Sequence, residues 1–110
     1  MIEAFRRRLG LTDTPFLLGG LGDFLGDCPL SEHLKNYPRV NEALRQVAAD
    51  DPLCAYVPAD GLGSNPDLLH FNARSLYTFG ERYADALVSF GLPKDGTAAE
   101  ADERTAMERL

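Results

Sequence analysis

Residues 53–57, which read Leu-Cys-Ala-Tyr-Val, form a short apolar run between two segments rich in turn-forming residues. A second run of this kind, Phe-Leu-Leu-Gly-Gly-Leu, occupies residues 16–21. Continuous apolar runs of this length are typical of strands that are buried on both faces, as in a parallel sheet. We therefore predict two buried strands, and the segment between them indicates how they are joined.

One amphipathic helix lies between the two predicted strands. Apolar residues recur at helical spacing from Val40 to Ala48, Pro38 lies near the first turn, and Asp-Asp-Pro at residues 50–52 ends the helix. A strand–helix–strand unit implies a right-handed crossover and a parallel pair, so the predicted fold class is α/β. Residues 22–37 are predicted to be a long loop, at the edge where open α/β sheets bind ligands.

Two further helices flank this unit and complete the order α-β-α-β-α. The first contains Ile2, Phe5 and Leu9, and Gly10 can end it. The last follows Asn72, which suits an N-cap, and Gly80 within it predicts a close contact with the sheet. Its expected core face consists of Leu76, Phe79, Tyr83, Leu87 and Phe90. Residues 97–100 have capping-box spacing, which predicts a short polar helical tail.

The composition restricts the classes of function. The chain has 110 residues, which suits one domain, and its net charge of −6 argues against a nucleic-acid partner. The basic run at residues 6–8 is expected to be a solvated helix face.

No apolar run is long enough to span a bilayer, and the first residues lack a signal peptide, so we expect a cytoplasmic protein with no membrane partner unless an upstream signal has been lost. Cys28 and Cys54 are too few for a disulfide framework, so both are expected to be reduced, with Cys54 in the core.

The sequence Asp67-Leu-Leu-His70 places a carboxylate three residues before an imidazole. This spacing suits a hydrolytic pair, in which Asp67 holds one ring nitrogen of His70 and the other nitrogen takes a proton from a nucleophile. Two plainer interpretations remain open. His70 can be a helix-capping or core residue, and Asp67 can be a turn residue after Pro66.

The residues around this pair resemble the SGNH-hydrolase superfamily, in particular its sialate O-acetylesterase and acetylxylan-esterase-related branch. The matching residues are Asp67, His70, Phe71, Gly80, Arg82, Tyr83 and Ala84, together with residues 15–22. The resemblance covers residues 1–92. It implies a partial flavodoxin-like three-layer fold, with residues 1–93 as the C-terminal half of the domain and residues 94–110 as a polar tail that is helical or disordered.

The resemblance also implies a function and its residues. His70 would be the general base, Asp67 would orient it, and Asp23 and Phe24 would line the mouth of the substrate cleft. The substrate would be an acetylated carbohydrate, and neither a metal nor an organic cofactor would be required. The exposed edges of two strands need further strands, from a chain carrying the N-terminal half or from a second copy in a homo-oligomer.

The family nucleophile is a serine in a Gly-x-Ser block, and the sequence contains no such block. Residues 22–25 resemble the related Gly-Asp-Ser-Leu motif, but Phe24 replaces the serine. Cys28 is an alternative nucleophile, although it precedes Pro29 in a loop rather than a helix start. The serines at 31, 64, 75 and 89 lack a nucleophile elbow. The chain is thus expected to supply the acid–base pair of a serine esterase and to be nearly inactive alone.

Three alternatives to the esterase remain open. A truncated hydrolase can persist as a non-catalytic oligomeric module. A small flavodoxin-like domain can bind a phosphorylated ligand at residues 19–26, although no P-loop lysine follows these glycines. A metal site from His33, Asp23, Asp27 and His70 matches no recognised zinc spacing.

Overall fold

The computed structural model describes residues 1–30 and 32–91. It contains five regular elements in the predicted order α-β-α-β-α and two short 3₁₀ helices. Their bounds are α1 Ile2–Leu9, β1 Phe16–Gly19, η1 Asp23–Asp27, η2 Glu32–Asn36, α2 Tyr37–Asp50, β2 Cys54–Val57 and α3 Ala73–Val88. The predicted tail at residues 94–110 lies outside the described residues. No helix among the described residues is long and apolar enough to cross a membrane.

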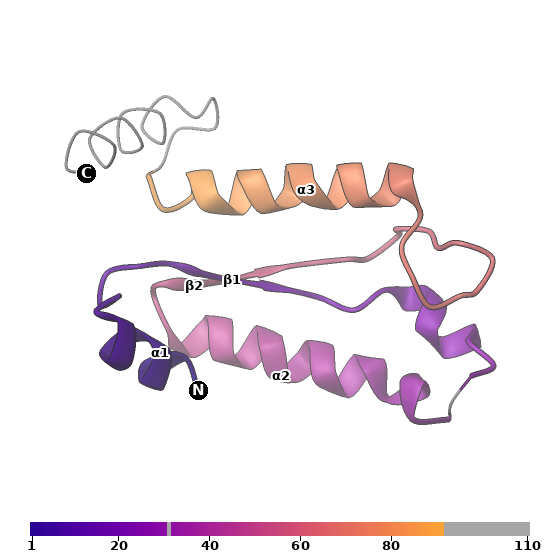
Figure 1. The fold of residues 1–110 in the computed structure, drawn as a ribbon, viewed down its shortest axis with the longest axis horizontal. Coiled ribbons are helices and arrows are strands. Elements are labelled where there is room, and N and C mark those ends of the chain that lie inside the picture. Colours follow the sequence, from indigo (N-terminus) through magenta and orange to yellow (C-terminus); the bar gives the residue numbers. More distant parts are fainter. Residues whose placement is uncertain (31, 92–110) are drawn as a thin grey trace.

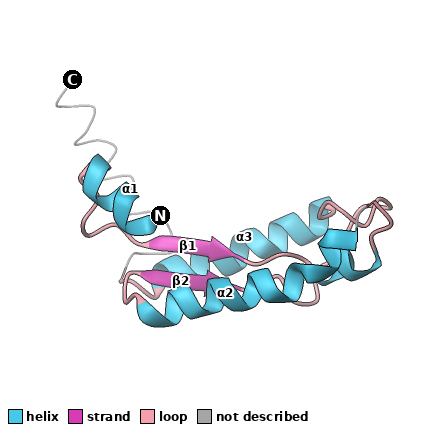
Figure 2. Ribbon diagram, turned by 90° about the horizontal axis from the view of Figure 1, so that it is seen from below, coloured by secondary structure: helices cyan, strands magenta, loops and turns pink. Residues whose placement is uncertain are grey.

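The two strands form a parallel sheet, as the strand–helix–strand pattern predicts. Phe16 lies opposite Cys54, and Gly19 lies opposite Val57. Figure 1 shows α3 on one side of this sheet and α1 and α2 on the other. In the view turned by 90°, α1 lies near the start of β1 (Figure 2). The fold is therefore a partial α/β fold in three layers, and the fold class is confirmed.

The predicted loop at residues 22–37 is partly helical. In η1, each turn is formed by a hydrogen bond between residues three apart. The Leu25 N–H donates to the Gly22 carbonyl at 3.2 Å, and the Cys28 N–H donates to the Leu25 carbonyl at 3.3 Å. Turns of this length carry no helical periodicity, so the sequence pattern does not reveal them. Strand β1 also ends earlier than expected, because the backbone of Leu21 bonds to a side chain of α2 instead of to β2.

The core lies between the sheet and α3. Its buried residues are Val57, Ala59, Leu62 and Phe79. The predicted core face of α3 is partly wrong, since Leu76 is 55% exposed and Leu87 is also exposed. Two strands make a narrow sheet, so it covers only the centre of the apolar stripe on α3.

Gly19 and Gly80 differ in what surrounds them. A Cβ on Gly19 would overlap the hydroxyl of Tyr83, so glycine allows α3 to approach the end of β1 closely. A Cβ on Gly80 would meet nothing within 4 Å, and Gly80 is exposed. The predicted sheet contact of Gly80 is therefore wrong, and the close contact belongs to Gly19.

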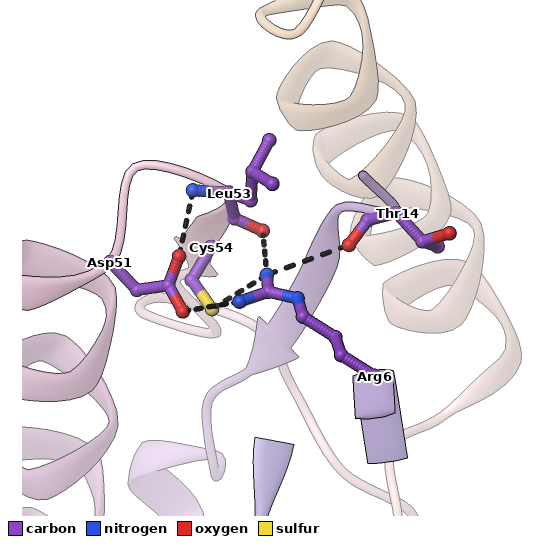
Figure 3. Close-up of polar contacts among 5 residues, drawn as sticks. All are labelled: Arg6, Thr14, Asp51, Leu53 and Cys54. Carbon is purple, nitrogen blue, oxygen red and sulfur yellow. Dashed lines mark hydrogen bonds and ion pairs between the residues drawn. The ribbon is translucent and has the colours of Figure 1, made fainter. Parts of the chain in front are cut away.

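Arg6 attaches α1 to the amino-terminal edge of the sheet (Figure 3). Its Nη1 lies 2.6 Å from Asp51 Oδ2, and its Nη2 donates to the carbonyl oxygens of Leu53 at 3.0 Å and Thr14 at 3.5 Å. The guanidinium also lies 5.1 Å from the ring centre of Phe16. The prediction that residues 6–8 form one solvated face is therefore wrong for Arg6.

The contact between Arg6 and Asp51 and the burial around it shift the pKa values of Asp51 and Cys54. The hydrogen bond from Arg6, with a further one from the Leu53 N–H, lowers the pKa of Asp51. Burial, followed by the nearby Asp51 charge, raises the pKa of the Cys54 thiol. Cys54 and Cys28 are both free; the burial of Cys54 was expected, whereas that of Cys28 was not.

Candidate active site

The loops that follow the two strands meet at the carboxyl edge of the sheet, together with the start of α3 (Figures 1 and 2). Strand β1 leads into residues 20–36, and β2 leads into residues 58–72. The edge beyond the carboxyl ends of parallel strands is where open α/β sheets bind ligands. The predicted pair, Asp67 and His70, lies in the second of these loops.

The structure brings Asp67 and His70 into direct contact. His70 Nδ1 lies 2.7 Å from Asp67 Oδ2. The other carboxylate oxygen accepts hydrogen bonds from the backbone N–H groups of Leu69 at 2.9 Å and His70 at 3.1 Å. The His70 side chain is 70% exposed, so it is not a core residue, and the N-cap of α3 is Asn72. Asp67 forms a turn and also holds the imidazole.

The contacts of Asp67 favour one charge state and one tautomer. The hydrogen bond with His70, and then those from the backbone of Leu69 and His70, lower the pKa of Asp67 to about 2. Asp67 is therefore a carboxylate at neutral pH and can only accept hydrogen bonds. The neutral imidazole consequently carries its proton on Nδ1, and Nε2, which has no partner among the described residues, keeps its lone pair.

Side chains of α3 hold the loop that carries the pair. The Ser75 hydroxyl accepts from the Gly63 N–H at 2.7 Å, and the Asn72 side chain accepts from the Ser75 N–H at 2.8 Å. Further along the helix, Arg82 Nη1 donates to the carbonyl oxygens of Pro58 and Asp60, each at 2.9 Å. Ser75 and Arg82 therefore tie the loop after β2 to α3.

The loop also closes on itself around the pair. The Asn65 N–H donates to the carbonyl of His70 at 2.9 Å, and Ser64 and Phe71 form an antiparallel bridge. Leu68 lies between the paired residues with φ of 56°, in the left-handed region that a branched side chain rarely adopts. The backbone is thus bent tightly between Asp67 and His70.

The expected cleft residues, Asp23 and Phe24, both contact this loop. Asp23 Oδ2 accepts from the Gly61 N–H at 3.0 Å. The ring of Phe24 packs edge-on against Phe71, with 5.2 Å between ring centres, and Phe71 follows His70 in the sequence. Both residues therefore lie beside the loop that carries Asp67 and His70, and each contacts a residue of that loop.

Comparison with known families agrees with the resemblance seen in the sequence. The family described as carbohydrate esterase, sialic acid-specific acetylesterase matches residues 1–89, which is most of the chain. The chain belongs to this carbohydrate esterase family. No curated protein matches the chain.

The candidate nucleophiles in the described part of the chain take part in contacts that hold the fold. The Cys28 thiol is buried and donates to the backbone carbonyl of Asp67 at 3.7 Å. Ser64 lies in the bridge to Phe71, and the Ser75 hydroxyl bonds to Gly63. Ser89 bonds to the carbonyl of Ala86 at the far end of α3. Ser31 lies outside the described residues.

The metal and phosphate alternatives gain no support from the described residues. Within residues 1–30 and 32–91, no three His, Cys, Asp or Glu side chains group as metal ligands would. His33 is an exposed residue of η2. In the glycine-containing loop after β1, the backbone of Leu21 is already bonded to a side chain of α2.

That side chain belongs to Asn41, which was not among the residues predicted from the sequence. Its Oδ1 accepts from the Leu21 N–H at 2.7 Å, and its Nδ2 donates to the Leu21 carbonyl at 3.0 Å. Asn41 is only 3% exposed. A polar residue three positions before Leu44 and seven before Ala48 shares their helix face, and this spacing was the available indication.

Proposed function

We propose that this chain supplies the acid–base pair of a serine-dependent carbohydrate O-acetylesterase of the SGNH type. The observation that carries the proposal is the 2.7 Å contact between His70 Nδ1 and the Asp67 carboxylate. A carboxylate on one ring nitrogen and an unpartnered lone pair on the other is the arrangement required of a general base. Membership of the carbohydrate esterase family supports the substrate class.

In the proposed reaction, His70 Nε2 takes the proton of a serine hydroxyl as the serine oxygen attacks the acetyl carbonyl. Asp67 stabilises the imidazolium that forms, and backbone N–H groups of the complete site hold the oxyanion. The imidazolium then protonates the departing sugar oxygen, which leaves an acetyl-serine. Water, deprotonated by the same nitrogen, releases acetate and restores the serine. This route needs no metal or organic cofactor.

The serine lies outside this chain in our proposal. The hydroxyls of Ser75 and Ser89 bond to backbone groups, Ser64 lies in the backbone bridge to Phe71, and the chain contains no Gly-x-Ser block. A polypeptide carrying the N-terminal half of the domain would bring the serine to His70. Residues 1–93 would then act as the C-terminal half, and an O-acetylated sugar such as a sialate would be the substrate.

The test combines this chain with a separately produced N-terminal half from a member of the same family. Hydrolysis of p-nitrophenyl acetate and of an O-acetylated sialate is measured for the mixture and for each part alone. We expect activity only in the mixture, and we expect His70→Ala to reduce it by about 10²–10⁴-fold. Undiminished activity of the His70 variant would refute the proposal.

Cys28→Ser provides the matched control. The chain alone is expected to show no turnover above the imidazole background. Turnover by the chain alone that disappears in both the His70→Ala and Cys28→Ser variants would instead identify a cysteine esterase.

A second candidate is a non-catalytic oligomeric module derived from the same family. The observation that favours it is the two-stranded sheet, in which each strand has one edge without a neighbour in the described part of the chain. Sedimentation of the purified chain tests it: stable oligomers whose mixture with the N-terminal half stays inactive would favour the module over the esterase.

A further inference from the structure

Three side chains from η1 and its C-cap residue contact the loop that follows β2. Asp23 and Phe24 contact the two ends of this loop. The third side chain, Cys28, contacts its middle, because the thiol donates to the backbone carbonyl of Asp67 at 3.7 Å. Of these three contacts, the one made by Cys28 is therefore at the Asp67–His70 pair itself.

The thiol and the pair differ greatly in exposure. Cys28 is only 3% exposed, whereas the side chains of Asp67 and His70 are 40% and 70% exposed. The backbone of Asp67 thus rests on a buried side chain, while its carboxylate and the imidazole remain accessible to solvent. An S–H group donates only weakly, so most of the support comes from the space that the packed side chain fills between η1 and the turn.

The geometry within the pair is set by the loop alone. The Asp67 carboxylate accepts from the N–H groups of Leu69 and His70 and contacts the imidazole, and all these groups belong to one loop. Cys28 instead joins the backbone of this loop to η1, which lies outside it. Cys28 can therefore set the place of the pair in the molecule without altering the contact between its two members.

We propose that Cys28 is a positioning residue for the general base: it holds the Asp67 turn against η1 and so sets the position of His70 Nε2 relative to the reacting carbonyl. The catalytic part of this inference rests on the proposed function, whereas the support of the turn does not. Proton transfer requires Nε2 within hydrogen-bonding reach of the nucleophile, and a displacement of about 1 Å can lower a rate by about 10²-fold. A buried side chain that fixes this loop is thus a determinant of kcat.

Two substitutions and a matched control test this role. Cys28→Ala removes the contact and leaves a void, and Cys28→Ser keeps a donor near the carbonyl of Asp67. The control is Cys54→Ala, because Cys54 is also a free, buried cysteine but begins β2 at the amino-terminal edge of the sheet. A void at Cys54 should lower stability without reaching the pair.

Residual dipolar couplings measure the orientation of the loop by NMR without any ester substrate. In Cys28→Ala, the N–H couplings of residues 62–70 should differ from the wild-type values, while those of α3 stay the same. The pKa of Asp67 should remain about 2, because the contacts within the loop remain. Cys28→Ser should retain most of the wild-type couplings, and Cys54→Ala should retain all of them in this loop.

The second readout is the hydrolysis of p-nitrophenyl acetate by the mixture with the N-terminal half. Cys28→Ala should lower kcat by about 10- to 10²-fold with little change in KM, since the base is displaced while the groups that bind the substrate are not altered. Cys28→Ser should recover most of this activity. Cys54→Ala should leave kcat unchanged.

Four results would overturn the proposal. These are unchanged couplings in Cys28→Ala, an equal change of the same couplings in Cys54→Ala, a rise of the Asp67 pKa toward 3.8 in Cys28→Ala, or a wild-type kcat of this variant in a mixture that requires His70. A mixture that is inactive, or active without His70, would refute the esterase instead. The couplings would then still decide whether Cys28 holds the turn.

Discussion

The side-chain amide of Asn41 bonds to both backbone groups of Leu21, so that α2 holds the first residues after β1 in place. The segment that begins at Leu21 also reaches the second loop, because Asp23 accepts from the Gly61 N–H and Cys28 donates to the carbonyl of Asp67. A buried residue of α2 therefore helps to fix the loop of the Asp67–His70 pair through contacts on the opposite side of the sheet.

Replacing Asn41 by leucine should destabilise the fold. The substitution keeps the size of the side chain but removes two partly buried hydrogen bonds to the N–H and C=O of Leu21, and each lost bond costs about 0.5–1.5 kcal/mol. Urea denaturation measures the change in the free energy of unfolding. Gln46→Leu, on the exposed part of the same helix, is the control and should change little. Equal effects of the two substitutions would contradict the role given to Asn41.

Asp67 should make stability depend on pH in the acid range. Its pKa in the folded chain is about 2, below the ordinary value of 3.8. A carboxyl group whose pKa is lowered by folding stabilises the fold above the unfolded-state value, and this contribution is lost as the pH falls through the folded-state value. The difference in unfolding free energy between wild type and Asp67→Asn should therefore shrink from pH 4 toward pH 2.

The carboxyl carbon of Asp67 gives a direct check by NMR titration. In His70→Ala, the pKa of Asp67 should rise, because the largest cause of its lowering is removed. It should stay below 3.8, since the backbone N–H groups of residues 69 and 70 remain. Titration of wild-type Asp67 near its ordinary value would show that the pair is not formed in solution.

Alanine substitutions at two glycines should act in opposite directions. Gly19→Ala would force its Cβ against the hydroxyl of Tyr83, and such overpacking typically costs about 1–3 kcal/mol. Gly80→Ala adds a methyl group in open space on a helix, which should stabilise the fold by up to about 1 kcal/mol. Thermal unfolding measures both, and Tyr83→Leu should reduce the penalty of Gly19→Ala. A destabilising Gly80→Ala would contradict the exposed position of this residue.

Removing the Arg6 guanidinium should loosen α1. The helix has no buried residue, and Arg6 bonds it to Asp51 and to the backbone of Leu53. In Arg6→Met, the pKa of Asp51 should rise and the amides of α1 should exchange faster with solvent. Arg7→Met, on an exposed neighbouring residue, is the matched control. Unchanged exchange in the Arg6 variant would mean that other contacts attach the helix.

The parts of the fold that were correctly predicted depend on residues close together in the sequence. Helical spacing located α1, α2 and α3, and apolar runs located both strands. The contact between Asp67 and His70 follows from a separation of three residues. Each of these patterns is complete within one element or one loop, so no knowledge of the neighbouring elements is needed.

The contacts that were missed join distant residues. Arg6 meets Asp51 across 45 positions, and Asn41 meets Leu21 across 20. The periodicity of a helix shows which residues share a face, but not which group on another element lies opposite. For the same reason, Gly19 and Gly80 could not be told apart: only the packed structure shows that an aromatic ring lies over one of them.

The tight bend at Leu68 has a consequence for how this site can vary. Because Asp67 and His70 lie on either side of one bend, the distance between them is set within a single loop. A change in the length of the segments that join this loop to β2 or to α3 would move both residues together. The imidazole would remain oriented by the carboxylate of Asp67, while the direction in which it faces would change. A change in loop length would thus re-aim the intact pair instead of separating its two members.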